Sequence, residues 1–325
     1  MTFGPGPGAG PGRPLTINSH VHMQRLGKEF SDELADFYME SNEGRTCWHT
    51  GQPWRKEDFC VPADRLIADM DRLGIDKSFV LGIAFLPYNA YDPEAAEYAA
   101  GMVERYPDRL IGFYTANPGG GYAEAKRFER GIETLGLSGL KLLPAGNRLA
   151  LNDRRMWPLF EVAQGHGVPI VMHTGWNGFP RGRVLEWEHP MYLEDVLLDF
   201  PDLKIVMAHL GFQWADEALW LMARSPNLYG DLAFWDESVP LWRLAQVCSW
   251  AKKLGVLDRI LWGSDYPFMA FEPGMDLFRR VPGYTERHEL EPFVTEEDLG
   301  TYFGGAAARL IGLTPEPASR RLTCD

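Results

Sequence analysis

The sequence predicts an α/β protein whose fold is a (β/α)8 TIM barrel. Short apolar runs alternate with longer amphipathic segments along the chain, which is the pattern of repeated strand–helix units. Eight such pairs are present, the number that a closed parallel barrel needs. A doubly wound open sheet is the alternative, but it normally has a glycine-rich phosphate loop after its first strand, where this chain has His20-Val-His22.

The predicted elements alternate from the first strand to a closing helix. Strands are expected over 15–20, 77–83, 110–116, 139–143, 169–173, 204–209, 227–232 and 259–263. Helices are expected over 63–73, 93–105, 121–135, 152–165, 190–200, 215–223, 238–254 and 295–311. Two connections, 23–61 and 266–295, are long, and in a barrel both would lie on the catalytic face. We interpret the first as either a lid or a packed loop without a chemical role.

Composition excludes several classes of protein. The chain has 325 residues and a formal net charge of −13, which argues against a nucleic acid or an anionic membrane as partner. No apolar run approaches the ~18 residues that a membrane span needs. The four cysteines match no zinc-finger spacing, so we expect reduced thiols and a cytoplasmic protein.

One domain is expected. Residues 1–14 are rich in glycine and proline and are predicted to be a disordered tail. No linker-like segment interrupts 15–313, so this range is predicted to be the barrel, and 314–325 a C-terminal tail.

Ionisable side chains gather at the ends of five predicted strands. They are His20 and His22, Lys141, His173, His209 and Asp265. Alternate residues of a strand face the same side, so both imidazoles of the first strand point together. The carboxyl ends of barrel strands meet on one face, where barrel enzymes carry out their chemistry. The pattern therefore predicts a metal centre at this face.

Histidines and a carboxylate suit one divalent ion, with zinc as the first choice and manganese or iron as alternatives. The ion would lower the pKa of a bound water towards ~7. Asp265 could ligate the ion and accept a proton, while His209 could contact the water or a developing oxyanion, or bind a second metal. Lys141 lies between Leu140 and Leu142, so alternation along the strand predicts that it faces the barrel interior. There it would face a substrate carboxylate, or bridge two metals if it were carboxylated.

These motifs resemble the amidohydrolase superfamily, in the family-2 group that includes aminocarboxymuconate-semialdehyde decarboxylase-like enzymes. The motifs are His20-Val-His22, His173-Thr-Gly175, His209-Leu-Gly211, Gly263-Ser-Asp265-Tyr-Pro267, the 200–209 segment and the closing 307–313 segment. The resemblance covers roughly residues 15 to 313. It implies a metal-dependent barrel enzyme, and homodimers are usual in that family.

The resemblance also implies roles for particular residues. His20, His22, His173 and Asp265 would be metal ligands, and His209 would activate water or polarise the substrate. Three positions depart from the family pattern. Asn18 stands where many relatives have Asp, Ala306 occupies the usual Asn position in the closing helix, and strand four ends Lys-Leu-Leu-Pro rather than Lys-Leu-His-Pro.

Aromatic and basic side chains follow the predicted strand ends and are candidates for substrate binding. They are Trp176, Arg181, Arg183, Trp214 and Trp235. Aromatic walls with one or two guanidinium groups suit a small, flat, anionic substrate. Alternatively, the aromatic rings pack the loops and the arginines pair with nearby glutamates.

Three functions follow from these patterns. The main prediction is a metal-dependent hydrolase that uses a metal-activated water on a small carboxylated or carbonyl-bearing substrate, cyclic or aromatic. The alternative is a metal-dependent non-oxidative decarboxylase of an aromatic or unsaturated carboxylic acid, which would use the same ligands. The third is a catalytically silent metal-binding protein.

Overall fold

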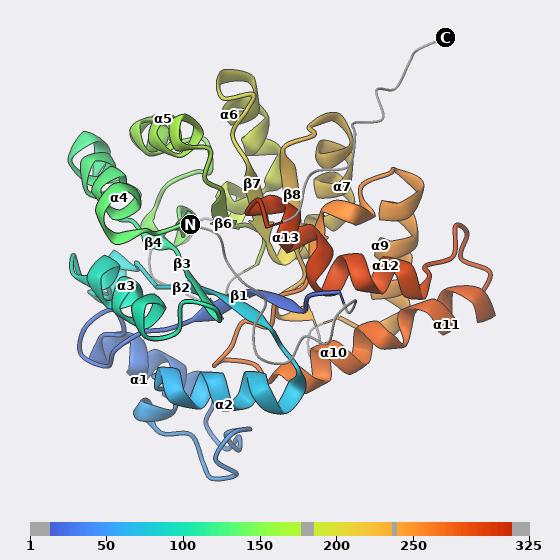
Figure 1. Ribbon diagram of the computed structural model, residues 1–325, viewed down its shortest axis with the longest axis horizontal. Helices are drawn as coiled ribbons and strands as arrows, with labels where there is room; N and C mark the ends of the chain where they lie inside the picture. Colours follow the sequence, from blue (N-terminus) through green and yellow to red (C-terminus); the bar gives the residue numbers. More distant parts are fainter. Residues whose placement is uncertain (1–13, 177–184, 236–238, 314–325) are drawn as a thin grey trace.

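The computed structural model describes residues 14–176, 185–235 and 239–313. Figure 1 shows parallel strands gathered at the centre with helices around them. The strands are β1 (Ile17–His22), β2 (Lys77–Leu81), β3 (Leu110–Gly112), β4 (Tyr114–Thr115), β5 (Leu140–Leu142), β6 (Ile170–His173), β7 (Ile205–Ala208), β8 (Leu228–Asp231) and β9 (Ile260–Leu261). Each of the eight predicted strands is therefore confirmed, with the third divided into β3 and β4.

The division of the third strand falls at Phe113. The Phe113 N–H donates to the carbonyl of Val80 in β2 at 3.0 Å, and the next N–H, of Tyr114, donates to Gly139 at 2.8 Å. The strand thus changes partner at this residue, which separates the ladder β1–β2–β3 from the ladder β4 to β9.

Hydrogen bonds join the last strand to the first and close the ring. The Ser19 N–H donates to Trp262 O at 2.9 Å, and the Asp265 N–H donates to His20 O at 2.9 Å. The His22 N–H donates to Tyr266 O at 2.7 Å. This closure places the His20-Val-His22 segment beside Asp265, although the two are far apart in sequence.

Strand residues alternate between the barrel interior and the helices. Leu140 and Leu142 belong to the large core shared with the surrounding helices. Lys141 lies opposite Val171 in the ladder, and Val171 belongs to the separate cluster inside the barrel. Because side chains alternate along a strand, Lys141 faces the interior, as the sequence predicts.

The helices surround the barrel in chain order. They are α2 (Ala63–Leu73), α3 (Ala95–Arg105), α4 (Gly121–Leu135), α5 (Trp157–His166), α6 (Leu193–Asp199), α7 (Ala215–Arg224) and α9 (Leu241–Lys253). The predicted bounds of α2 and α4 match residue for residue. Both end at a glycine in the left-handed region, Gly74 and Gly136, each with φ 69°.

The closing helix is α12 (Glu296–Gly300), a π-helical turn (Thr301–Gly305) and α13 (Ala306–Leu310). A capping box begins this helix, since the Thr295 hydroxyl accepts from the Asp298 N–H and the Asp298 carboxylate accepts from the Thr295 N–H. Gly304 lies against the start of β1, where a Cβ would come 1.7 Å from Leu15 O. This close approach requires glycine.

The two long connections contain helices that we did not predict. The first includes α1 (Asp32–Ser41), and the last includes α10 (Phe271–Arg279) and α11 (Val281–Arg287). The Ser31 hydroxyl caps α1 by accepting from the Leu34 N–H at 3.1 Å, so a local helix signal was present in the sequence.

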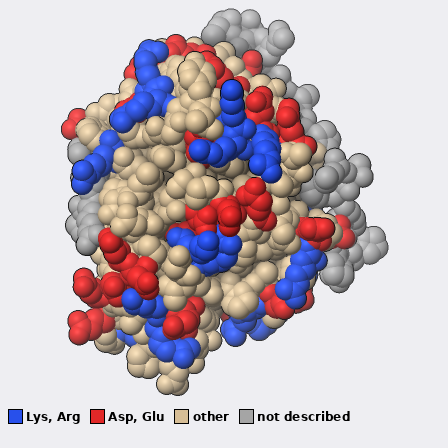
Figure 2. Space-filling view, turned by 90° about the vertical axis from the view of Figure 1, so that its left-hand side faces the viewer, with Lys and Arg blue, Asp and Glu red and all other residues tan. Residues whose placement is uncertain are grey.

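Two surface properties complete the fold. On the face shown in Figure 2, acidic and basic side chains are mixed in small groups, without one broad basic area. Among the described residues, no helix combines the length and the apolar character needed to cross a membrane.

Candidate metal centre and active site

Three of the predicted ligands converge at the carboxyl ends of the strands. His20 Nε2 lies 3.2 Å from His22 Nε2. Asp265 Oδ1 lies 3.1 Å from His22 Nε2 and 3.4 Å from His20 Nε2. Ligand atoms around a tetrahedral zinc ion lie about 3.3 Å from one another. The three atoms are therefore spaced as the ligands of one divalent ion would be, and this donor set fits such an ion.

The backbone around Gly263 allows this convergence. A Cβ on Gly263 would lie 2.7 Å from the Cβ of His20, so only glycine fits between the two strands. Asn18 accepts from the N–H groups of His20 and Ser264 at 3.0 and 3.1 Å. Asn18 thus ties β1 to the segment that carries Asp265.

Asp231, at the end of β8, is a buried carboxylate that our sequence analysis missed. Its Oδ2 lies 2.9 Å from His20 Nδ1, which orients the other ring nitrogen of His20 towards the site. Its Oδ1 accepts from the N–H groups of His209 and Ala233 at 2.9 and 3.1 Å. Burial alone would raise the pKa of Asp231, but the interaction with His20 lowers it to about 2. Asp231 could have been found from the sequence as a carboxylate at the end of a predicted strand.

His209 begins a tight turn after β7 and has φ 62°. Its Nδ1 lies 2.9 Å from Ala233 O, so Nδ1 carries the proton and Nε2 is left as an acceptor. Its ring lies 5.1 Å from that of His20, between centroids. Burial lowers the pKa of His209 to about 3, so the imidazole is neutral at physiological pH.

His173 lies at the end of β6, next to His209. The two rings are 4.9 Å apart between centroids. His173 Nδ1 lies 3.4 Å from Oε1 of Glu188, a second buried carboxylate that the sequence analysis did not single out. His173 is not part of the three-residue donor group of His20, His22 and Asp265. Its role as a metal ligand stays a prediction.

Lys141 approaches the donor group of His20, His22 and Asp265 from the opposite side of the barrel. Its Nζ lies 3.2 Å from His20 Nε2, and its side chain is buried. Burial lowers the pKa of Lys141 to about 8, against the opposing effect of Asp231 and Asp265. Most of the ammonium stays charged at neutral pH, so an anion at this position would meet a buried cation.

The predicted substrate-binding residues lie in different environments. Trp176 is exposed, and Trp214 packs against His189 in a tilted arrangement with centroids 4.6 Å apart. Trp235 is buried and donates from Nε1 to His209 O at 2.9 Å, so in this structure it supports the turn of His209. Arg181 and Arg183 lie outside the described residues. Substrate contact for all of these residues stays a prediction.

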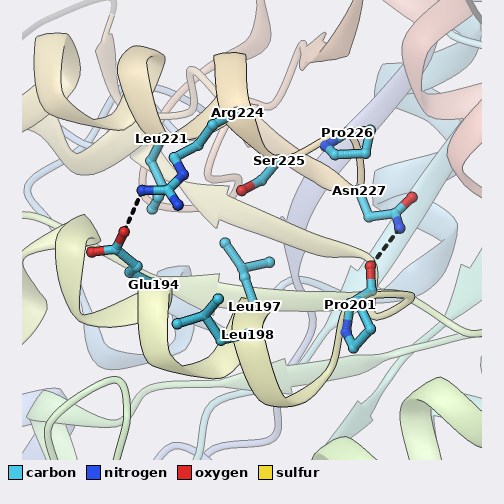
Figure 3. A pocket seen from close by; sticks show the side chains of 9 residues that line it. All are labelled: Glu194, Leu197, Leu198, Pro201, Leu221, Arg224, Ser225, Pro226 and Asn227. Atoms are coloured by element: carbon cyan, nitrogen blue, oxygen red, sulfur yellow. Dashed lines mark hydrogen bonds and ion pairs between the residues drawn. The ribbon is translucent and has the colours of Figure 1, made fainter. Parts of the chain in front are cut away.

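A separate hollow, whose lining includes none of the residues of this site, lies between α6 and α7 (Figure 3). Pro201 and Asn227, which line it, precede β7 and β8, so it opens at the amino ends of the strands. Glu194 and Arg224 form an ion pair across it. Because the charges of Glu194 and Arg224 balance each other, we assign no chemistry to the hollow.

A family model described as amidohydrolase matches residues 79–313. This match spans well over half of the chain, and the chain therefore belongs to amidohydrolase family 2, the class of barrel enzyme that the motifs indicate. The matched range contains His173, His209 and Asp265 but begins after β1, so it does not include His20 and His22.

Similar solved structures cover nearly the whole chain. A dihydroxybenzoic acid decarboxylase from a Polaromonas species, solved with bound manganese and 2-nitroresorcinol, has a TM-score of 0.70 at 18% identity and covers 92% of this chain and 97% of its own. The 5-carboxyvanillate decarboxylase LigW from Sphingomonas paucimobilis has a TM-score of 0.63 at 16% identity, with 92% and 99% covered. An uncharacterised TIM-barrel protein from Bordetella bronchiseptica has a TM-score of 0.67 at 20% identity, with 92% and 98% covered. These likenesses establish the TIM-barrel fold.

The contacts of Asp231 lead to a first prediction. Asp231→Asn keeps the shape of the side chain but removes the charge that orients His20, so we expect metal affinity to fall by about 10- to 100-fold. Titration of the metal-free protein with Mn²⁺ or Zn²⁺ measures this change. Asp76→Asn is the matched control, since Asp76 is a buried carboxylate that holds Thr16 N at 2.8 Å before β2, at the other end of the barrel. Equal affinities in wild type and Asp231→Asn would refute the role.

Proposed function

We propose that this protein is a metal-dependent, non-oxidative decarboxylase of an aromatic or unsaturated carboxylic acid. The observation that carries the proposal is the meeting of the His20, His22 and Asp265 donor atoms with the buried ammonium of Lys141. At this point a carboxylated substrate could contact both the divalent metal ion and the ammonium group of Lys141. Similarity to decarboxylases of hydroxylated aromatic acids supports the same reaction.

A divalent ion held by these donors would act as a Lewis acid towards the oxygen atoms of the substrate. Lys141 would attract the carboxylate and hold it in a site where water screens the attraction poorly. Decarboxylation breaks the bond between the carboxylate and its carbon, whose electron pair then takes up a proton. The protein must therefore deliver one proton to that carbon.

His209 is the residue that we propose for this proton transfer. Its Nδ1 is held by Ala233 O, and Nε2 is available to accept a proton from a substrate hydroxyl or from water. Burial lowers the pKa of His209, so the ring is neutral between turnovers, and a proton that it takes up during the reaction would be passed on to the carbon atom. Asp265, whose pKa is held well below its usual range by its histidine neighbours in spite of burial, would remain an anionic ligand.

The identity of the ion is part of the proposal. Imidazole and carboxylate donors suit manganese as well as zinc. Zinc was the first choice from the sequence, whereas two similar decarboxylases have bound manganese in their crystals. We therefore propose one divalent ion and treat manganese and zinc as the two candidates.

Hydrolysis is the second candidate, since the same donors could hold a water that attacks a carbonyl carbon. It was the main prediction from the sequence, and the comparisons favour decarboxylation instead. The two reactions differ in their products, because only decarboxylation releases CO2 and places a solvent proton on carbon.

Incubation with a panel of hydroxybenzoic and unsaturated acids, and of their esters, in heavy water enriched in oxygen-18 tests the proposal. For protein loaded with Mn²⁺ or Zn²⁺, we expect CO2 release, one deuterium atom on the product carbon, and loss of both on chelation. Oxygen-18 in the product without CO2 would favour hydrolysis. Stoichiometric metal binding without turnover of any acid or ester would favour the catalytically silent alternative.

A further inference from the structure

A second group of potential metal ligands lies in the long connection after β1. The Sγ of Cys47, a ring nitrogen of His49 and a carboxylate oxygen of Asp58 all lie within 4.8 Å of one another. Cys47 and Asp58 are buried, and His49 is partly buried. None of the three belongs to the barrel site. We propose that these residues, with a water molecule as the fourth ligand, form a zinc site that fixes the connection against the active-site face.

The backbone brings the three side chains together from two separate segments. The Cys47 N–H donates to Gln52 O at 2.8 Å, and the Gly51 N–H donates to Cys47 O at 2.9 Å, which closes a short turn that carries Cys47 and His49. Asp58 comes from the next piece of regular structure, the 3-10 helix Lys56–Phe59. Apart from this turn and the short helix, the segment between α1 and α2 has little regular structure of its own (Figure 1).

The donor set is that of zinc. Thiolate, imidazole and carboxylate are its three protein ligand types, and sulfur selects it over manganese or magnesium. Ligand atoms of a tetrahedral zinc ion lie about 3.3 to 3.6 Å apart, so movements of roughly 1 Å would bring the three donors into place. A water molecule would complete the tetrahedron.

Neighbouring groups orient two of the donors. His49 Nε2 lies 2.9 Å from the carbonyl oxygen of Asp58, so Nε2 carries the proton and donates it to this oxygen. Nδ1 is then the nitrogen that could bind the metal, and this division of roles is usual for a metal-bound histidine. The Asp58 carboxylate accepts from the Arg55 N–H at 2.8 Å and from its guanidinium at 3.3 Å. One thiolate and one carboxylate also balance the double charge of the ion, which lowers the cost of burying it, and the Arg55 guanidinium that contacts Asp58 is largely exposed to solvent.

Trp48 connects this proposed zinc site to the segment that follows Asp265. Trp48 lies between two of the ligands, and its Nε1 donates to Pro267 O at 2.9 Å. Its ring contacts Tyr266, with centroids 5.5 Å apart. Both residues directly follow Asp265. A zinc ion that fixes the Cys47–His49 turn would therefore also hold Trp48 against the segment that carries the barrel ligand.

Cobalt substitution tests the proposal without a change in the chain. Metal-free full-length protein, kept reduced with a phosphine, is titrated with Co²⁺ and followed by near-ultraviolet absorption. The barrel donors contain no sulfur, so a thiolate-to-cobalt charge-transfer band reports on the Cys47 site alone. We expect this band in the wild type, its loss in Cys47→Ser, and its retention in Cys60→Ser, the matched control from the same connection.

Zinc content gives the second measurement. After loading and dialysis, we expect about two zinc ions per chain in the wild type and about one in Cys47→Ser and in His49→Gln. His49→Gln serves as a second variant because Cys47 is fully buried and its replacement could impair folding. The absence of a charge-transfer band in wild-type protein, or a band unchanged in Cys47→Ser, would overturn the proposal. Neither result depends on turnover, so this test is independent of the test of the proposed decarboxylase function.

Discussion

Replacement of Asp265 by asparagine is expected to remove the barrel metal and to lower turnover by at least about 10³-fold. Asp265 Oδ1 is the anionic member of the donor group and lies within 3.4 Å of the ring nitrogens of both His20 and His22. Asparagine preserves the size of the side chain but not its charge, so the ion would lose its anionic ligand. Elemental analysis after dialysis and an assay of CO2 release measure the two effects on the same sample.

The control for this variant is Asp298→Asn. Asp298 caps α12 and pairs with Lys252 at 2.6 Å, at the outside of the barrel. Its replacement is expected to cost some stability but to leave metal content and turnover unchanged. Full metal content and wild-type turnover in Asp265→Asn would show that Asp265 is not a ligand, and the mechanism would be wrong.

Replacement of His209 is expected to separate metal binding from catalysis. In His209→Ala, we expect the metal to stay bound and turnover to fall by about 10²- to 10⁴-fold, because the ring that transfers the proton is lost. His209 has φ 62°, a conformation that asparagine tolerates better than alanine, so His209→Asn is the second variant and should be the more stable of the two. Turnover and metal content are measured for both.

His166→Ala is the control, since His166 is partly exposed at the end of α5. Wild-type turnover in both variants of His209 would remove this residue from the chemistry. Loss of one metal equivalent together with activity would instead identify His209 as a ligand, which was the second-metal alternative in the sequence analysis.

The strands and their catalytic ends could be predicted because the signals are local. Apolar runs with a polar side chain at the carboxyl end identified β1, β6 and β7, and alternation along β5 correctly placed Lys141 inside the barrel. The bounds of α2 and α4 were predictable because glycines end both helices. The position of Asp265 beside His20 follows from barrel closure once the strand order is known.

Other features depend on contacts between distant residues. The change of partner at Phe113 follows from how neighbouring strands fit around the ring, which no local pattern records. Asp231 matters because its carboxylate reaches His20, a residue 211 positions away. In the sequence it is one acidic residue at a strand end. The same holds for Glu188, whose contact with His173 becomes visible only in the folded chain.

The most direct test is a crystal structure of the Mn²⁺- or Zn²⁺-loaded protein with data collected at the absorption edge of that metal. The anomalous map should show one peak at the strand ends, about 2.0 to 2.2 Å from His20 Nε2, His22 Nε2 and an Asp265 oxygen. His173 would be the next ligand, and any peak at Cys47 would be additional. A fully loaded protein with no peak among His20, His22 and Asp265 would contradict the account.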